Sequence, residues 1–65
     1  MDAIKMVVVF RTISSINVLV LDNQTLIDEF EVSHKSSNAY GKVRDFIDSC
    51  KDKYIVRIKD EDGIL

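Results

Sequence analysis

The sequence predicts a small α+β domain in which a mostly antiparallel sheet carries one helix on one face. Two early segments are rich in β-branched residues and are separated by short polar turns. One later segment, from Ala39, has apolar residues at helical spacing, and a final β-branched segment, Tyr54–Lys59, follows it. With 46% hydrophobic and 31% charged residues and no proline, the 65-residue chain has a globular composition. We therefore expect one domain spanning residues 1–65, with the order β-β-β-α-β.

The first two strands are predicted from β-branched runs bounded by turn residues. Ile4–Ile13 has apolar residues on both of its alternating faces, which is typical of a central strand. Ser14-Ser15 and Asn17 mark a turn, and Val18–Leu21 continues as the second strand. Asp22–Gln24 is rich in side chains that bond to their own backbone, which predicts a second turn.

The segment Thr25–Ser33 fits two patterns. Leu26, Ile27 and Phe30 could form one face of a helix. Phe30 and Val32, however, alternate with glutamates and a serine, and the preceding turn is short. The alternation favours a third strand in a meander, with a helix as the alternative.

The helix is predicted from Ala39 onward, after a polar loop at His34–Ser37 in which serines or Asn38 could cap it. A right-handed crossover through this helix places the fourth strand beside the first, so the sheet order would be 4-1-2-3. The residues Asp60–Gly63 are expected to be a frayed polar terminus.

One helix covers one face of a sheet, so the other face is left open. The expected covered face consists of Ile4, Met6, Val8, Phe10, Leu19, Leu21, Leu26, Phe30, Val32, Tyr54, Val56 and Ile58. The expected open face has an apolar centre and a charged rim, and consists of Val7, Val9, Val18, Val20, Ile27 and Ile55 with Lys5, Arg11, Glu29, Glu31, Arg57 and Lys59. That composition is typical of a protein interface, although valines also favour any half-exposed strand. A homodimer through this face would fit the same pattern.

Catalytic chemistry is sparse in this sequence. Cys50 falls on the apolar side of the predicted helix, where a thiol behaves as a small hydrophobe. His34 is predicted to be a solvated loop residue. His34 and Cys50 are too far apart in sequence for a metal-ligand motif, and Gly41 and Gly63 form no phosphate-binding loop. We expect a protein that is not an enzyme and that uses no cofactor or metal.

Charge and hydropathy limit the classes of partner. The net charge is −2 and most basic residues are interleaved with acids, which disfavours direct nucleic-acid binding. Mimicry of a phosphate backbone by the acidic residues is disfavoured by the same interleaving. No run approaches the roughly 20 apolar residues of a membrane span, and a single cysteine agrees with a reducing compartment. We expect a cytoplasmic protein.

Several segments resemble the small Dmd antitoxins of T-even-like phages. They are Ile4-Lys5 followed by Val7-Val8-Val9-Phe10, the late helix segment Phe46-Ile47-Asp48, and the connection Lys51-Asp52-Lys53 into a terminal strand. The likeness covers most of the chain outside residues 12–37. It implies a phage-encoded protein that acts in the host cytoplasm and neutralises a host mRNA-cleaving endoribonuclease toxin of the RnlA/LsoA type. Inhibition would occur by protein–protein contact that obstructs the toxin's active site.

The contact residues are predicted from the expected open face and the loop before the helix, and none is carried over from the resemblance. They are Val7, Val9, Arg11, Val18, Val20, Glu29, Glu31, His34 and Asn38. On this hypothesis Val9→Asp and Val18→Asp would abolish association without unfolding the domain. The alternative functions are a structural or assembly module that self-associates through the same face, and a small nucleic-acid-binding accessory protein.

Overall fold

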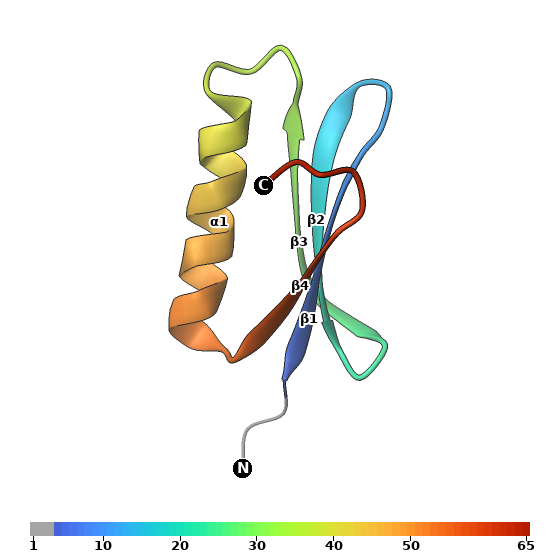
Figure 1. Cartoon of the computed structure of the whole chain (residues 1–65), viewed down its shortest axis with the longest axis vertical. Helices are drawn as coiled ribbons and strands as arrows, with labels where there is room; N and C mark the ends of the chain where they lie inside the picture. The colour runs from blue at the N-terminus through green and yellow to red at the C-terminus, as the bar shows by residue number, and fades with distance from the viewer. Residues whose placement is uncertain (1–3) are drawn as a thin grey trace.

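The computed structural model describes residues 4–65, which form a four-stranded sheet with one helix against one of its faces (Figure 1). The elements are β1 (Lys5–Arg11), β2 (Ser15–Asp22), β3 (Thr25–Ser33), α1 (Ala39–Lys53) and β4 (Val56–Asp60). In the sheet order β3-β2-β1-β4, the β1–β2 and β2–β3 pairs are antiparallel and the β1–β4 pair is parallel. The predicted α+β class, element order and strand order 4-1-2-3 are confirmed, and Thr25–Ser33 is a strand.

The hairpin between β2 and β3 contains an irregularity that determines the face of β3. Its turn residues, Asn23 and Gln24, both have positive φ, at 50° and 75°, as a tight two-residue hairpin turn requires. The pairing then shifts: Leu21 lies opposite Leu26, but Val20 lies opposite Asp28. The ladder therefore skips Ile27, which forms a β-bulge.

Because side chains alternate along a strand, a shift of one residue exchanges the two faces of β3 relative to β2. Without the bulge, Phe30 would lie opposite Asn17, on the side of Leu19 and Leu21. With it, Phe30 lies opposite Val18 and Val32 lies opposite Ile16. The apolar face of β3 thus joins the β-branched face of β2.

The prediction of which face of β1 and β2 the helix covers is wrong, because the helix packs on the opposite face. The buried residues are Val7, Val9, Ile16, Val18, Val20, Val32, Ala39, Val43, Ile47, Cys50 and Ile64, with Phe30, Phe46, Val56 and Ile58 packed against them. Of the predicted covered face, Phe30, Val32, Val56 and Ile58 are correct. The predicted core residues Met6, Val8, Phe10, Leu19 and Leu21 lie on the other side, as their pairing shows.

Helix α1 forms because its apolar residues recur every three or four positions and face the sheet. The Phe46 ring stacks on Phe30 with 5.0 Å between ring centroids and 14° between planes. Lys51 and Lys53 lie in the last turn, where cations stabilise the helix dipole. Tyr54 is extended and ends the helix, and no helix among residues 4–65 is long and apolar enough to cross a membrane.

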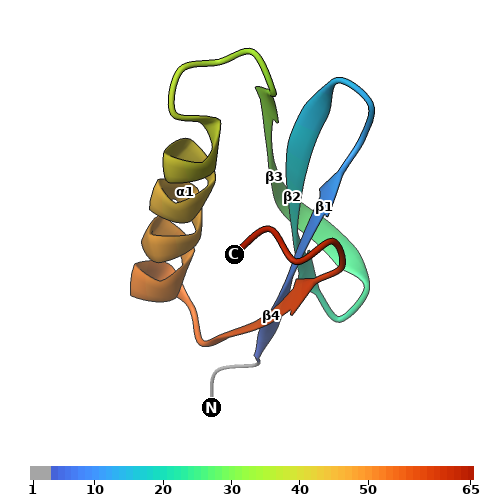
Figure 2. The same ribbon diagram turned by 45° about the horizontal axis from the view of Figure 1, so that its top comes forward.

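The segment after β4 is ordered, which corrects the expectation of a frayed end. It passes over the helix side of the sheet, where Ile64 is buried at 9% exposure (Figure 2). The Asp60 carboxylate accepts the backbone N–H groups of Ile64, at 2.8 Å, and of Leu65, at 2.7 Å. These bonds hold Ile64 over the part of the core that α1 leaves uncovered, since the helix packs mainly on β2 and β3.

The hydrogen bonds that the Asp60 carboxylate accepts should make a contribution to stability that is lost in acid. The Leu65 and then the Ile64 N–H groups lower the pKa of Asp60 below its ordinary value of 3.8. A carboxyl group with a depressed folded pKa stabilises the fold above its unfolded pKa, and this contribution is lost as pH falls through the folded pKa. Between pH 7 and pH 2, we therefore expect the wild-type melting temperature, followed by circular dichroism, to fall further than that of Asp60→Asn. The exposed helix variant Asp45→Asn should behave as wild type; an equal acid response in Asp60→Asn and wild type would contradict the role of the turn.

Candidate protein-binding face

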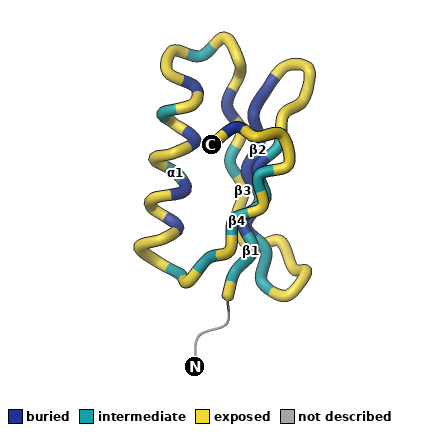
Figure 3. Tube along the Cα trace, viewed as in Figure 1, coloured by how far each residue is buried: buried dark blue, intermediate teal, exposed yellow. Residues whose placement is uncertain are grey.

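The side of the sheet away from α1 carries a continuous set of half-buried apolar side chains. We call this set the open face and define it as Met6, Val8, Phe10, Leu19 and Leu21. Met6 lies opposite Leu21 and Val8 opposite Leu19, so the set occupies the two central strands. Buried and half-buried residues alternate along these strands (Figure 3). No element among residues 4–65 covers this side, which leaves apolar surface available to a partner.

Charges of opposite sign flank the open face. On the β3 edge, Glu29 lies opposite Leu19, and Glu31 lies opposite Asn17. On the β4 edge, Arg57 and Lys59 pair in register with Met6 and Val8.

All four charged residues of this rim are exposed. An apolar centre with a charged rim resembles the anatomy of protein–protein interfaces. Here Glu29 and Glu31 occupy the β3 edge, and Arg57 and Lys59 occupy the β4 edge, where Glu61 lies 3.6 Å from Lys59.

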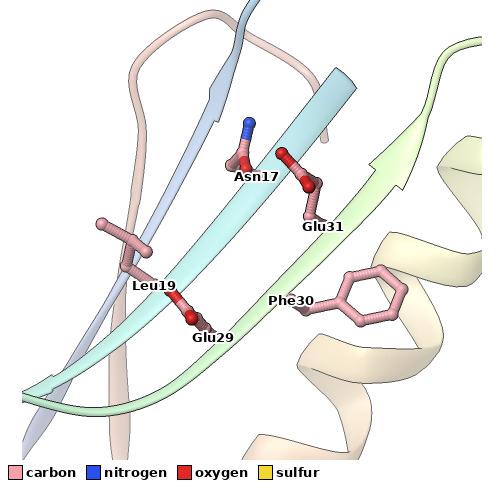
Figure 4. Close-up of a pocket in the computed structure, with 5 residues that line it drawn as sticks. All are labelled: Asn17, Leu19, Glu29, Phe30 and Glu31. Carbon is pink, nitrogen blue, oxygen red and sulfur yellow. The ribbon is translucent and has the colours of Figure 1, made fainter. Parts of the chain in front are cut away.

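A shallow hollow lies on the acidic side of the open face. It has a volume of about 260 Å³ and is lined by Asn17, Leu19, Glu29 and Glu31, with Phe30 beneath. Figure 4 shows the carboxylates of Glu29 and Glu31 on this side of the strands, whereas the Phe30 ring points toward the helix. Two carboxylates and an amide beside an aliphatic wall suit the stem and ammonium group of a lysine side chain.

The predicted contact residues separate into four groups. Val7, Val9, Val18 and Val20 are 0% exposed on the helix side of the sheet and cannot touch a partner, which corrects their assignment to the open face. Arg11 is exposed, but it pairs with Ile16 and so belongs to the helix side. Only Glu29 and Glu31 lie beside the open face as predicted.

His34 and Asn38 lie at the end of the molecule rather than on the open face. The His34 backbone N–H donates to the Ser14 carbonyl at 3.1 Å, and its ring Nε2 lies 3.0 Å from the Thr12 carbonyl. His34 therefore ties the end of β3 to the β1–β2 turn. Asn38 precedes α1 in a left-handed conformation, with φ of 54°, and makes no side-chain capping bond.

The Asn38 side chain fills the space where a Cβ at Gly41 would lie. Alanine normally stabilises a helix interior by about 1 kcal/mol over glycine, but here its methyl group would overlap the Asn38 amide. We expect Gly41→Ala alone to leave the free energy of unfolding nearly unchanged or to lower it. The same change in an Asn38→Gly background should raise the free energy of unfolding by about 1 kcal/mol. Urea unfolding of the four proteins of this cycle measures the coupling. Equal gains in both backgrounds would show that the Asn38 contact has no energetic consequence.

The groups that most often carry chemistry are not placed for it. Cys50 is buried, and burial, followed by the nearby charge of Asp28, raises the pKa of its thiol. The thiol is thus held protonated at neutral pH, which is the reverse of what a nucleophile needs. Residues 4–65 contain no group of three histidine, cysteine, aspartate or glutamate side chains arranged to hold a metal ion.

Comparisons with protein families, with curated proteins and with solved structures find no match to this chain. The open face therefore has to be interpreted from its own residues.

Sequence reasoning assigned the residues of the open face to the core, and Asn17 is the signal that identifies them. Asn17 lies within β2, where it alternates with Ile16 and Val18. An amide is costly to bury, so the side of β2 that carries it is the uncovered one.

Proposed function

We propose that this protein is an inhibitor that binds a ribonuclease toxin of the RnlA/LsoA type through its open face and blocks the toxin's active site by direct contact. In this role it would be phage-encoded and would act in the host cytoplasm. It would use no cofactor and no catalytic residue of its own.

The observation that carries this proposal is the uncovered apolar centre of the sheet between an acidic and a basic edge. Half-buried Val8, Phe10 and Leu19 supply apolar area that a partner can remove from water, at about 25 cal/mol per Å². The rim charges orient a partner and exclude others by like-charge repulsion.

The class of partner rests on the resemblance to Dmd antitoxins. The segments that carry it include β1, the second half of α1 and the connection into β4. Val8 and Phe10 of the open face belong to the first of these segments. A small protein can inhibit a larger ribonuclease simply by occupying its substrate groove, so this function requires affinity and shape but no chemistry.

The proposal is tested by mixing the purified protein with a purified RnlA- or LsoA-type toxin. The mixture is separated by size exclusion with light scattering, and RNA cleavage is assayed on the same fractions. Co-elution with loss of cleavage supports the proposal. Separate elution with cleavage intact, at concentrations where both proteins are folded, overturns the toxin as partner.

A further inference from the structure

The register of the four strands arranges the open face in rows that run across the sheet. One row contains Glu29, Leu19, Val8 and Lys59, from the β3 edge to the β4 edge. Its two charged ends are of opposite sign and its centre is apolar. When the same row of a second copy faces it in the opposite direction, each acid therefore lies opposite a base and the apolar centres lie opposite each other.

From this arrangement we infer that a second copy of this chain occupies the open face in the free protein, related by a two-fold axis that runs parallel to the strands. Such an axis places β3 of one copy over β4 of the other, and β2 over β1. Leu19 then faces Val8 of the second copy, and Glu29 faces Lys59. Each contact occurs twice, as in any isologous dimer.

The charges distinguish this axis from the other simple arrangement. A two-fold axis across the strands would place β3 over β3 and β4 over β4. Glu29 would then face Glu29, and Lys59 would face Lys59, and like charges directly opposite one another are destabilising. Both axes keep the strands of the two sheets aligned, as in sheets that pack face to face within about 30°, so the charges alone distinguish them.

The hollow beside Leu19 can accommodate the Lys59 side chain of the second copy. Its two carboxylates and the Asn17 amide surround a space open to solvent. Within its own chain, Lys59 lies 3.6 Å from Glu61, and both side chains are largely exposed, at 63% and 47%. An exposed pair of this kind contributes little, so Lys59 can exchange it for the Glu29 carboxylate of the second copy.

The size of the face determines how the dimer is measured. Four strands about 4.8 Å apart and about five residues long give a face of roughly 300 Å². A dimer through this face would bury roughly 600 Å² in total, which is below the size of standard interfaces, so we expect a weak and transient dimer that dissociates between micromolar and millimolar concentration. The inference concerns the protein without toxin and does not rest on the proposed function. Because a toxin would use the same face, it would compete with the second copy.

The experiment is sedimentation equilibrium of the free chain and three charge variants from micromolar to millimolar concentration. Glu29→Lys and Lys59→Glu each place like charges across the axis, and we expect each to weaken the dimer by about tenfold or more. The double variant Glu29→Lys/Lys59→Glu restores both pairs and should recover most of that loss. An equimolar mixture of the two single variants should associate more tightly than either alone. Both substituted positions, Glu29 and Lys59, are exposed, and circular dichroism checks that each variant is folded.

A wild-type chain that stays monomeric at millimolar concentration would overturn the inference. A dimer whose affinity does not change in either single variant would overturn the axis. Both results are obtained without toxin, so they are distinguishable from a failure of the proposed function.

Discussion

Val9→Asp is expected to unfold this domain, whereas Val8→Asp is expected to leave it folded. Val9 is 0% exposed in the core on the helix side of the sheet, and Val8 lies half-buried on the open face. A carboxylate at position 9 loses about 2 kcal/mol of apolar burial and adds a buried charge that lacks a partner. A chain of this length has a total stability of roughly 3–10 kcal/mol, so this loss is enough to unfold it.

The neighbouring variant is a matched control, because the residue type and the substitution are the same. At position 8 the carboxylate reaches water and lies beside Lys59, its pair across the β1–β4 ladder. We expect a fall in melting temperature of about 4–8 °C, corresponding to about 1 kcal/mol. Far-UV circular dichroism and thermal melts measure both variants. A folded Val9→Asp together with an unfolded Val8→Asp would show that the helix covers the other face.

If the protein inhibits a toxin as proposed, Val8→Asp should weaken that inhibition by about 100-fold, because it places a carboxylate at the centre of a desolvated interface. Val8 lies in the middle of the open face, between Leu19 and Lys59. The measurement is the concentration of protein that halves RNA cleavage by an RnlA- or LsoA-type toxin.

Ile13→Asp is the control for this loss. Ile13 lies in the β1–β2 turn beyond the strands and is fully exposed, at 102%. The same introduction of a carboxylate there should change inhibition little. If Val8→Asp is folded and inhibits as well as wild type, the open face is not where the toxin binds.

Much of the fold followed from local patterns. The strand order depends on hairpin turns, the helical spacing after Ala39 and the handedness of the crossover, all of which are readable along the chain. Two residues of the candidate site, Glu29 and Glu31, were also predicted, because β3 has one apolar and one charged face. Val8 and Val9 are chemically identical neighbours, and β1 is apolar on both sides, so its own pattern does not indicate which side faces the helix.

The error in the covered face came from one feature that acts between strands. The residues Val7, Val9, Val18 and Val20 were correctly grouped on one face, but that face was assigned to solvent. With a regular two-residue hairpin and no bulge, Phe30 would share the face of Leu19 and Leu21, as that assignment requires. The bulge at Ile27 shifts the register of β3 by one residue and so reverses it. No property of Ile27 in the sequence marks a bulge.

The open face as a protein-binding surface is tested most directly by the solvent exposure of its methyl groups, measured as relaxation by a soluble paramagnetic agent. In dilute free protein, the methyl groups of Val8 and Leu19 should be strongly relaxed, and those of Val7 and Val18 should not. Addition of the toxin should protect Val8 and Leu19 and leave the buried valines unchanged. If Val8 and Leu19 remain equally relaxed in the complex, while methyl groups elsewhere become protected, the partner binds another surface.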